Sequence, residues 1–240
     1  MGFDPRQVVV SCEHASNRVP PEMDAPPDLM ALHIAWDVGA LQVATRLARS
    51  LQAPLHKGEY SRLLVDLNRG EESSRLIRRV SDGHPIPFNR GLTPDEADRR
   101  IRLFHRPYRR AIEADVKRIV ERRGRCVHLA IHSFTPALQG KVRGNDLGLL
   151  YDPHRHPEVD LVREMRDLLA ERTGMVVWLN RPYSGTADGI QPPLRARYAP
   201  ERFVGIELEM NQRHASDERA LEKIADSFGA SLELLAWPPV

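Results

Sequence analysis

Two histidines stand at the ends of apolar, strand-like runs, and both could bind a metal ion. His14 follows the run VVVSC at residues 8–12, and His132 follows the run CVHLAI at residues 126–131. Imidazole nitrogen is a common ligand of divalent metals, and a catalytic zinc site usually adds a carboxylate and leaves one position for water. Singly, each histidine is better explained as a structural residue held by hydrogen bonds. Together they favour a metal site, for which one more protein ligand must be found.

Three residues could supply that third ligand. Glu13 adjoins His14, but neighbours on an extended strand point to opposite faces, so both can bind one ion only where the strand bends. Asn17 offers a neutral carboxamide, which is a weak ligand for zinc. Asp37 lies at the predicted start of a helix, where it could equally be an N-terminal cap. From the residues alone, all three remain open.

The segment FVGIELEMN at residues 203–211 carries two more carboxylates on a predicted strand. Side chains alternate between the faces of a strand, so Glu207 and Glu209 share one face and the apolar residues share the other. On an edge strand this pattern would mean only that one face is solvated. On a central strand the two carboxylates would be costly to bury without a partner ion, an arginine or a catalytic task. Both are therefore candidates for a general base.

Polar residues near the ends of two other predicted strands could bind substrate. Arg62 and Arg69 lie in the segment SRLLVDLNR at residues 61–69, and an arginine can hold a carboxylate through two parallel hydrogen bonds. The alternative for any one of the 31 arginines is a surface ion pair of little energetic worth. Asn180 and Tyr183 lie in a turn-like segment and could donate hydrogen bonds within a pocket.

The elements that must position these residues alternate between strands and helices. Strands are predicted at 7–13, 53–57, 62–67, 126–132, 147–151, 175–179, 203–210 and 231–236, and helices at 37–49, 93–123, 157–172 and 216–228. Thr93 and Glu96 have the spacing of a capping box, and Pro107 should kink or split its helix. The segment 68–91 reads as a surface loop. This order predicts an α/β protein with three layers, in which helices cover both faces of a mixed, mostly parallel sheet and the chemistry gathers at the carboxyl ends of the strands.

Composition limits the function classes. The 240 residues suffice for one sizeable core without a flexible linker, so we predict one domain over residues 1–240. The net charge is only +2, and the arginines are interleaved with acidic residues, which argues against a nucleic-acid partner. No apolar run could span a membrane, and the start of the chain lacks the features of an export signal. Cys12 and Cys126 both lie in apolar runs, which fits a reducing cytoplasm.

Taken in order, several motifs resemble the N-formylglutamate amidohydrolase family. They are SCEHASN at 11–17, HIAWDVGA at 33–40, SRLLVDLNR at 61–69, IHSFTP at 131–136 and NRPYSG at 180–185. The resemblance extends from about residue 8 to residue 213 and implies the α/β fold of zinc exopeptidases. Two departures are visible: the family's relatives have a His-x-x-Glu metal motif where this chain has His14 and Asn17, and Asn211 replaces an arginine that often follows the catalytic glutamate.

The resemblance implies a zinc-dependent amidohydrolase that acts on a small N-acyl amino acid, above all N-formyl-L-glutamate. It implies that His14, Asp37 and His132 hold the ion, with Asp37 preferred to Glu13. Further roles follow from it: Glu209 as the base with Glu207 as second choice, Arg62 at the oxyanion, and Asn68, Arg69, Ser133, Asn180 and Tyr183 around the substrate. The alternatives are a zinc peptidase, a deacylase of another N-acyl amino acid, and a non-catalytic carboxylate-binding homologue. The expected partner is this small molecule, and a homo-oligomer is left open.

Overall fold

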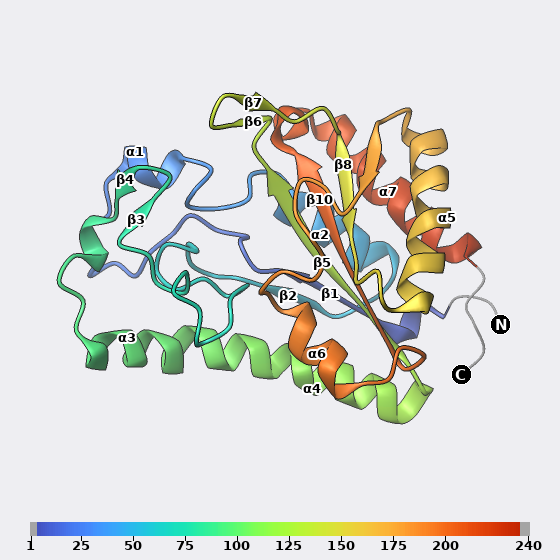
Figure 1. Ribbon diagram of the computed structural model, residues 1–240, viewed down its shortest axis with the longest axis horizontal. Helices are drawn as coiled ribbons and strands as arrows, with labels where there is room; N and C mark the ends of the chain where they lie inside the picture. The colour runs from blue at the N-terminus through green and yellow to red at the C-terminus, as the bar shows by residue number, and fades with distance from the viewer. Residues whose placement is uncertain (1–3, 236–240) are drawn as a thin grey trace.

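The computed structural model describes residues 4–235, and a six-stranded sheet lies at their centre (Figure 1). The strands, in spatial order, are β2 (Leu55–Lys57), β1 (Val8–Cys12), β5 (Cys126–Phe134), β10 (Phe203–Asn211), β8 (Leu147–Leu150) and β9 (Val177–Leu179). β8 runs antiparallel to β10, and every other neighbouring pair in this sheet is parallel. The predicted α/β fold with a mixed, mostly parallel sheet is therefore confirmed.

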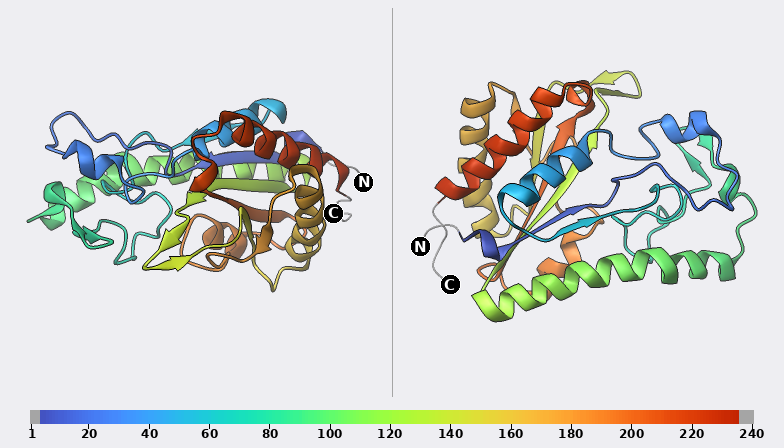
Figure 2. Two further views of the ribbon diagram at one scale, coloured as in Figure 1. Left: turned by 90° about the horizontal axis from the view of Figure 1, so that it is seen from above. Right: turned by 180° about the vertical axis from the view of Figure 1, so that it is seen from behind.

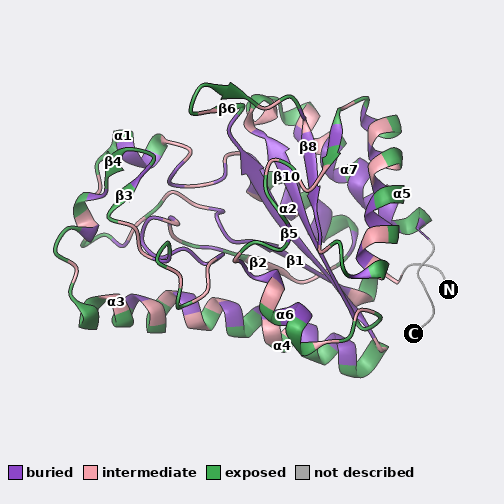
Figure 3. Cartoon of the chain, viewed as in Figure 1, coloured by how far each residue is buried: buried purple, intermediate pink, exposed green. Residues whose placement is uncertain are grey.

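Helices cover both faces of the sheet, which gives the three layers visible in Figure 2. On one face lie α2 (Ala40–Ser50), α5 (His156–Thr173) and α7 (Glu218–Leu234), and on the other lie α4 (Arg106–Arg123) and α6 (Gln191–Arg197). The apolar run of β1 serves both faces, since Val8 and Val10 pack into the cluster around α2 while Val9 packs into the cluster around α4. β1, β5 and β10 are buried along their whole length (Figure 3).

Short elements at one side of the sheet complete the fold (Figure 1). They are α1 (Pro27–Ala31), the hairpin of β3 (Val80–Ser81) with β4 (His84–Pro85), and α3 (Pro94–Arg100), while the hairpin of β6 (Ala137–Leu138) with β7 (Lys141–Val142) follows β5. Single 3-10 turns occur at Pro5–Gln7, Pro87–Asn89 and Gln212–His214. No helix within residues 4–235 is long and apolar enough to cross a membrane.

Thr93 caps the helix that was predicted to start there, because its hydroxyl accepts a hydrogen bond from the Glu96 N–H at 3.2 Å. A π-helical turn at Ile101–His105 then separates α3 from α4, and Pro107 lies in the first turn of α4. The predicted split is thus present, although the two helices stay in line in Figure 1. Such a wide turn accommodates the missing proline N–H.

The strand predicted at 62–67 is wrong. The segment forms consecutive turns in which side chains bind the backbone: Ser61 Oγ accepts from the Leu63 N–H at 3.1 Å, and Asp66 Oδ1 accepts from the Asn68 N–H at 3.0 Å. Such local bonds compete with a sheet ladder. The apolar residues that suggested a strand are buried all the same, because they pack beneath these turns.

The final strand predicted at 231–236 is also wrong, because α7 continues to Leu234; Ala236 lies outside the described residues. The buried residues Ile224, Phe228 and Leu232 recur every four positions, the spacing that keeps side chains on one face of a helix. Gly229 lies inside α7 and does not end it. The glycine allows α7 to pack closely against α2, because an added Cβ would lie 3.3 Å from Ser50 Oγ.

Candidate active site

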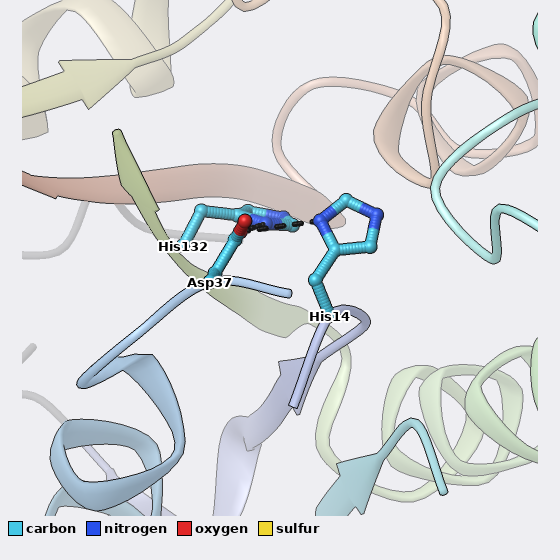
Figure 4. A group of neighbouring side chains, drawn as sticks. All are labelled: His14, Asp37 and His132. Carbon is cyan, nitrogen blue, oxygen red and sulfur yellow. Dashed lines mark hydrogen bonds and ion pairs between the residues drawn. The ribbon is translucent and has the colours of Figure 1, made fainter. Parts of the chain in front are cut away.

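Three elements bring the candidate metal ligands together (Figure 4). His14 follows the carboxyl end of β1, His132 lies near the carboxyl end of β5, and Asp37 precedes α2. β1 and β5 are parallel neighbours, so their ends lie side by side and the two imidazole centres are 5.0 Å apart. The Asp37 N–H donates to the carbonyl of His14 at 3.0 Å, which fixes the loop against the strand end.

The facing atoms form a compact donor set. The Nδ1 atoms of His14 and His132 lie 3.1 and 2.9 Å from Asp37 Oδ2, and the three residues offer donor atoms within 4.8 Å of one another. All three side chains are buried. Two imidazoles and a carboxylate are a set that zinc takes in catalytic sites, so these residues fit such an ion.

The outer nitrogen of each imidazole faces a second carboxylate. His14 Nε2 lies 2.7 Å from Asp66 Oδ1, and His132 Nε2 lies 3.1 Å from Glu13 Oε2. The hydroxyl of Tyr108 donates to the other oxygen of Glu13 at 3.0 Å. A carboxylate on the outer nitrogen holds a proton there, so Nδ1 is the nitrogen that could bind a metal in place of its contact with Asp37. Glu13 therefore contacts the side of the His132 ring that faces away from Asp37.

Asn17, the remaining candidate for the third ligand, turns away from this centre. Its side-chain amide donates to the carbonyl of Met30 at 3.0 Å, and Asn17 does not line the cavity. Among the described residues, Asp37 is the acid that forms a potential metal-binding group with His14 and His132.

The surrounding charges keep the acids ionised. Burial alone would raise the pKa of Asp37, but the two imidazoles and the Arg62 guanidinium outweigh burial and hold the pKa well below its usual range. Burial would likewise raise the pKa of Glu13, yet the contact with His132 lowers it to about 2. Both groups are anionic at neutral pH, as a cation-binding centre requires.

Arg62 bridges the two carboxylates that contact His14. Its Nη1 donates to Asp37 Oδ1 at 3.2 Å, and its Nη2 donates to Asp66 Oδ2 at 3.3 Å. Burial would raise the pKa of Asp66, and His14 with Arg62 lowers it well below its usual range. The guanidinium thus ties the two acids together while its side chain lines the cavity.

Glu207 and Glu209 lie on β10, a central strand, so the interpretation as a solvated edge does not apply. Both are buried at the cavity wall, with Glu209 in register with His132, and neither has an ion-pair partner within residues 4–235. Glu209 Oε2 is buried without a hydrogen-bond partner among these residues. Burial raises the pKa of Glu209 to about 8, and the charges of Asp37 and Glu207 add to the rise while His132 opposes it.

Replacing Glu209 with glutamine is expected to alter the stability of the metal-free chain in a pH-dependent way. This carboxyl ionises near 4.5 when unfolded but stays protonated to about 8 when folded. Between these values the unfolded state binds fewer protons, so the wild-type free energy of unfolding falls as pH rises. Because glutamine does not ionise, the variant should be more stable by on the order of 2 to 4 kcal/mol near pH 9 and similar near pH 5. Urea denaturation after chelation tests this; an equal difference at both values would contradict it.

A cavity of about 420 Å³ joins these groups. The predicted residues on its wall are His14, Asp37, Arg62, Asn68, Arg69, His132, Ser133, Tyr183, Glu207 and Glu209. Asn180, predicted to bind substrate, is not among them: its carboxamide oxygen accepts from the N–H groups of Tyr151 and Gly185, both at 3.0 Å, and its φ is +50°. Its carboxamide oxygen closes a turn, a conformation that asparagine tolerates well.

Several cavity residues were not predicted, namely His33, Asp66, Arg75, Arg78 and Asp188. Asp66 lies between the predicted Arg62 and Asn68 in the motif SRLLVDLNR, and this position was the available signal. Arg75 and Arg78 lie in the segment 68–91, for which the sequence predicts only an arginine-rich surface loop. Nothing in the spacing of that loop indicated which of its arginines reach the cavity.

Comparison with known proteins gives one consistent result. The sequence model of the N-formylglutamate amidohydrolase family matches residues 6–215. An N-formylglutamate deformylase of Pseudomonas putida is 28% identical over 153 residues, which span 58% of this chain and 56% of that protein, so the match covers little more than half of this relative. A gene product of Agrobacterium tumefaciens has a similar structure with a TM-score of 0.81 and 28% identity over 96% of this chain and 92% of that one. The N-formylglutamate amidohydrolase of Ralstonia eutropha shares the fold with a TM-score of 0.73 and 21% identity, over 95% and 90% of the two chains.

Proposed function

The chain belongs to the N-formylglutamate amidohydrolase family, and from this premise we propose that it hydrolyses N-formyl-L-glutamate to formate and L-glutamate. The observation that carries the proposal is the buried carboxyl of Glu209, unpaired among residues 4–235, beside a converging set of two imidazoles and a carboxylate. A buried acid without a partner is costly to maintain unless it has a chemical task. Proton transfer during amide hydrolysis is such a task.

We assign zinc as the cofactor, held by His14, Asp37 and His132. When bound there, zinc would supply Lewis acidity, which polarises the formyl carbonyl and lowers the pKa of the attacking water toward about 7. Glu13 and Asp66 would keep the two imidazoles oriented through their outer nitrogens.

Glu209 is the proposed general base. As water adds to the formyl carbon, its carboxylate takes the water proton and then delivers it to the leaving nitrogen when the carbon–nitrogen bond breaks. In the metal-free chain the pKa of this carboxyl is about 8, and a bound cation beside it would favour the ionised form that this role requires. Glu207, which is buried on the same face of β10, is the second choice for this role.

Arg62 is the proposed partner of the negative charge that develops on the formyl oxygen. The terminal nitrogens of an arginine carry two N–H groups each, and the contacts with Asp37 and Asp66 use one group on each nitrogen. Its remaining donors could stabilise the transition state by roughly 3 to 4 kcal/mol, as other oxyanion donors do.

Arg69 is the proposed partner of the substrate α-carboxylate, with Asn68, Ser133 and Tyr183 as further hydrogen-bonding groups. Its Nη1 donates to the backbone carbonyls of Asn68 and Asp188 at 2.7 and 2.6 Å, which holds the guanidinium in place. Its Nε is buried without a partner among residues 4–235. A fixed guanidinium with free donors suits a carboxylate.

We further propose that the chain works as one domain in the cytoplasm. Cys12 and Cys126 are both free and buried, as expected where thiols stay reduced. The residues that line the cavity come from segments distributed between His14 and Glu209, as expected when one folded domain forms the whole site.

Release of formate from a panel of acyl amino acids tests the function. The purified chain, supplied with zinc, should release formate from N-formyl-L-glutamate at a rate that chelation abolishes. N-acetyl-L-glutamate should react more slowly, and a short peptide should not react. Preference for an acetyl substrate would favour another deacylase, cleavage of the peptide would favour a peptidase, and zinc binding without any hydrolysis would favour a binding homologue.

A further inference from the structure

Four arginines line the cavity, and two of them are already engaged. Arg62 binds two carboxylates, and Arg69 binds two backbone carbonyls. The side chains of Arg75 and Arg78 form neither an ion pair nor a hydrogen bond within residues 4–235. The cavity wall therefore carries two guanidinium groups whose donors are uncommitted in this part of the chain.

The backbone of Arg78 is held firmly. The side-chain amide of Asn89 donates to the carbonyl of Arg78 at 2.6 Å and to the carbonyl of Leu63 at 2.8 Å. Asn89 is fully buried, and its oxygen accepts from Arg100 Nη1 at 2.5 Å. This carboxamide joins the segment of Arg78 to the turn that carries Arg62, so a long loop presents an arginine on a fixed support.

Two more backbone bonds secure the same segment. The Asp66 N–H donates to the carbonyl of Leu76 at 2.8 Å, and the Ile86 N–H donates to the carbonyl of Arg79 at 2.8 Å. Leu76 is buried in a cluster with Leu64 and two other apolar residues of the turn. The backbone that carries Arg78 therefore loses little freedom on binding, which favours recognition of an anion.

Several cations gather around Arg78. Its guanidinium is half-buried, and burial together with the cations of Arg62, Arg69 and Arg75 lowers its pKa, while Asp66 opposes this shift. Like charges brought together in a partly desolvated place raise the free energy of the site. An anion between them would relieve that repulsion.

We propose that Arg78, together with Arg75, forms a second carboxylate-binding subsite in the cavity. This deepens the proposed function and rests on it: Arg69 takes the α-carboxylate of the substrate, and the new subsite takes the carboxylate of its side chain. A second cationic group beside Arg69 distinguishes a dianion from a monoanion. The subsite thereby selects N-acyl amino acids with an acidic side chain over neutral ones.

The test compares N-formyl-L-glutamate with N-formyl-L-glutamine, which differ in the side-chain charge. The variants Arg78→Gln and Arg75→Gln should lower kcat/KM for the glutamate substrate by roughly 10- to 100-fold, mainly through KM, because each removes a charge-assisted hydrogen bond. Activity on the glutamine substrate should be nearly unchanged. Arg79→Gln is the matched control, since Arg79 is the next residue but does not line the cavity. An unchanged preference in the Arg75, Arg78 double variant would overturn the subsite.

A binding measurement separates failure of the subsite from failure of the proposed function. If the wild-type chain releases formate from neither substrate, the function is wrong, and calorimetric titration with glutarate and butyrate then tests the subsite alone. Glutarate should bind more tightly than butyrate, and the double variant should lose the difference. Equal binding of the two acids by the wild-type chain would overturn the proposal.

Discussion

Glu209→Gln is expected to lower kcat for formate release by roughly 10²- to 10⁴-fold, the usual contribution of a general base. Glutamine has nearly the same shape but cannot accept the proton of the attacking water. The side chain is not among the residues that converge as metal ligands, so the variant should keep its zinc. Formate release under saturating substrate and the metal content of the same sample measure both effects.

Glu207→Gln is the matched control for this change. Glu207 lies two residues earlier on the same face of β10, is equally buried, and also lines the cavity. We expect it to affect kcat much less than Glu209→Gln. If kcat falls strongly in the Glu207 variant and stays near normal in the Glu209 variant, Glu207 is the base. Normal turnover in both variants would rule out a base on this strand.

The meeting of the two histidines follows from features that the sequence displays. Continuous apolar residues in β1 and β5 predict strands buried on both faces, which belong in the middle of a sheet. The carboxyl ends of parallel strands meet at one edge, and His14 and His132 lie together there. The family match over residues 6–215 and the six-stranded mixed sheet confirm the predicted family and fold class.

The partners of these histidines were beyond sequence reasoning. Strand alternation indicates which face a side chain occupies, but not which imidazole nitrogen it reaches. Glu13 was therefore considered as a ligand, whereas its carboxylate contacts the outer nitrogen of His132. It also accepts a hydrogen bond from Tyr108, a residue of α4 that is far from it in the sequence. The contact of Asp66 with His14 likewise depends on the turns at residues 61–68. The apolar residues of that segment had suggested a strand there.

Some contacts that the sequence does not reveal are those in which a side chain binds the backbone of another segment. The carboxamide oxygen of Asn180 closes a turn, and the composition of residues 180–185 did not show which backbone groups it would bind. Arg78 reaches the cavity because buried Asn89 joins two segments of the chain. Such a bond between separate segments has no periodic pattern, so no spacing rule predicts it.

His14→Ala combined with His132→Ala is expected to abolish both zinc binding and hydrolysis. The wild-type chain, supplied with zinc, should contain about one ion per chain, and the double variant almost none. Loss of an outer partner such as Glu13 typically costs roughly 10- to 100-fold in metal affinity, and loss of two inner ligands must cost more. Elemental analysis after gel filtration measures the metal, and formate release measures the reaction.

His128→Gln is the matched control, since His128 lies on β5 four residues before His132 and is fully buried. Its Nε2 lies 2.9 Å from Ser11 Oγ, and burial lowers its pKa to about 4, so it is neutral at pH 7, and it is not part of the potential metal-binding group. This variant should keep its zinc. Removing His14 and His132 also leaves buried carboxylates with fewer partners, a change that can cost about 3 to 5 kcal/mol, so circular dichroism must show that the double variant is folded. A wild-type chain that binds no zinc would refute the metal assignment, because these buried donors would then serve structure alone.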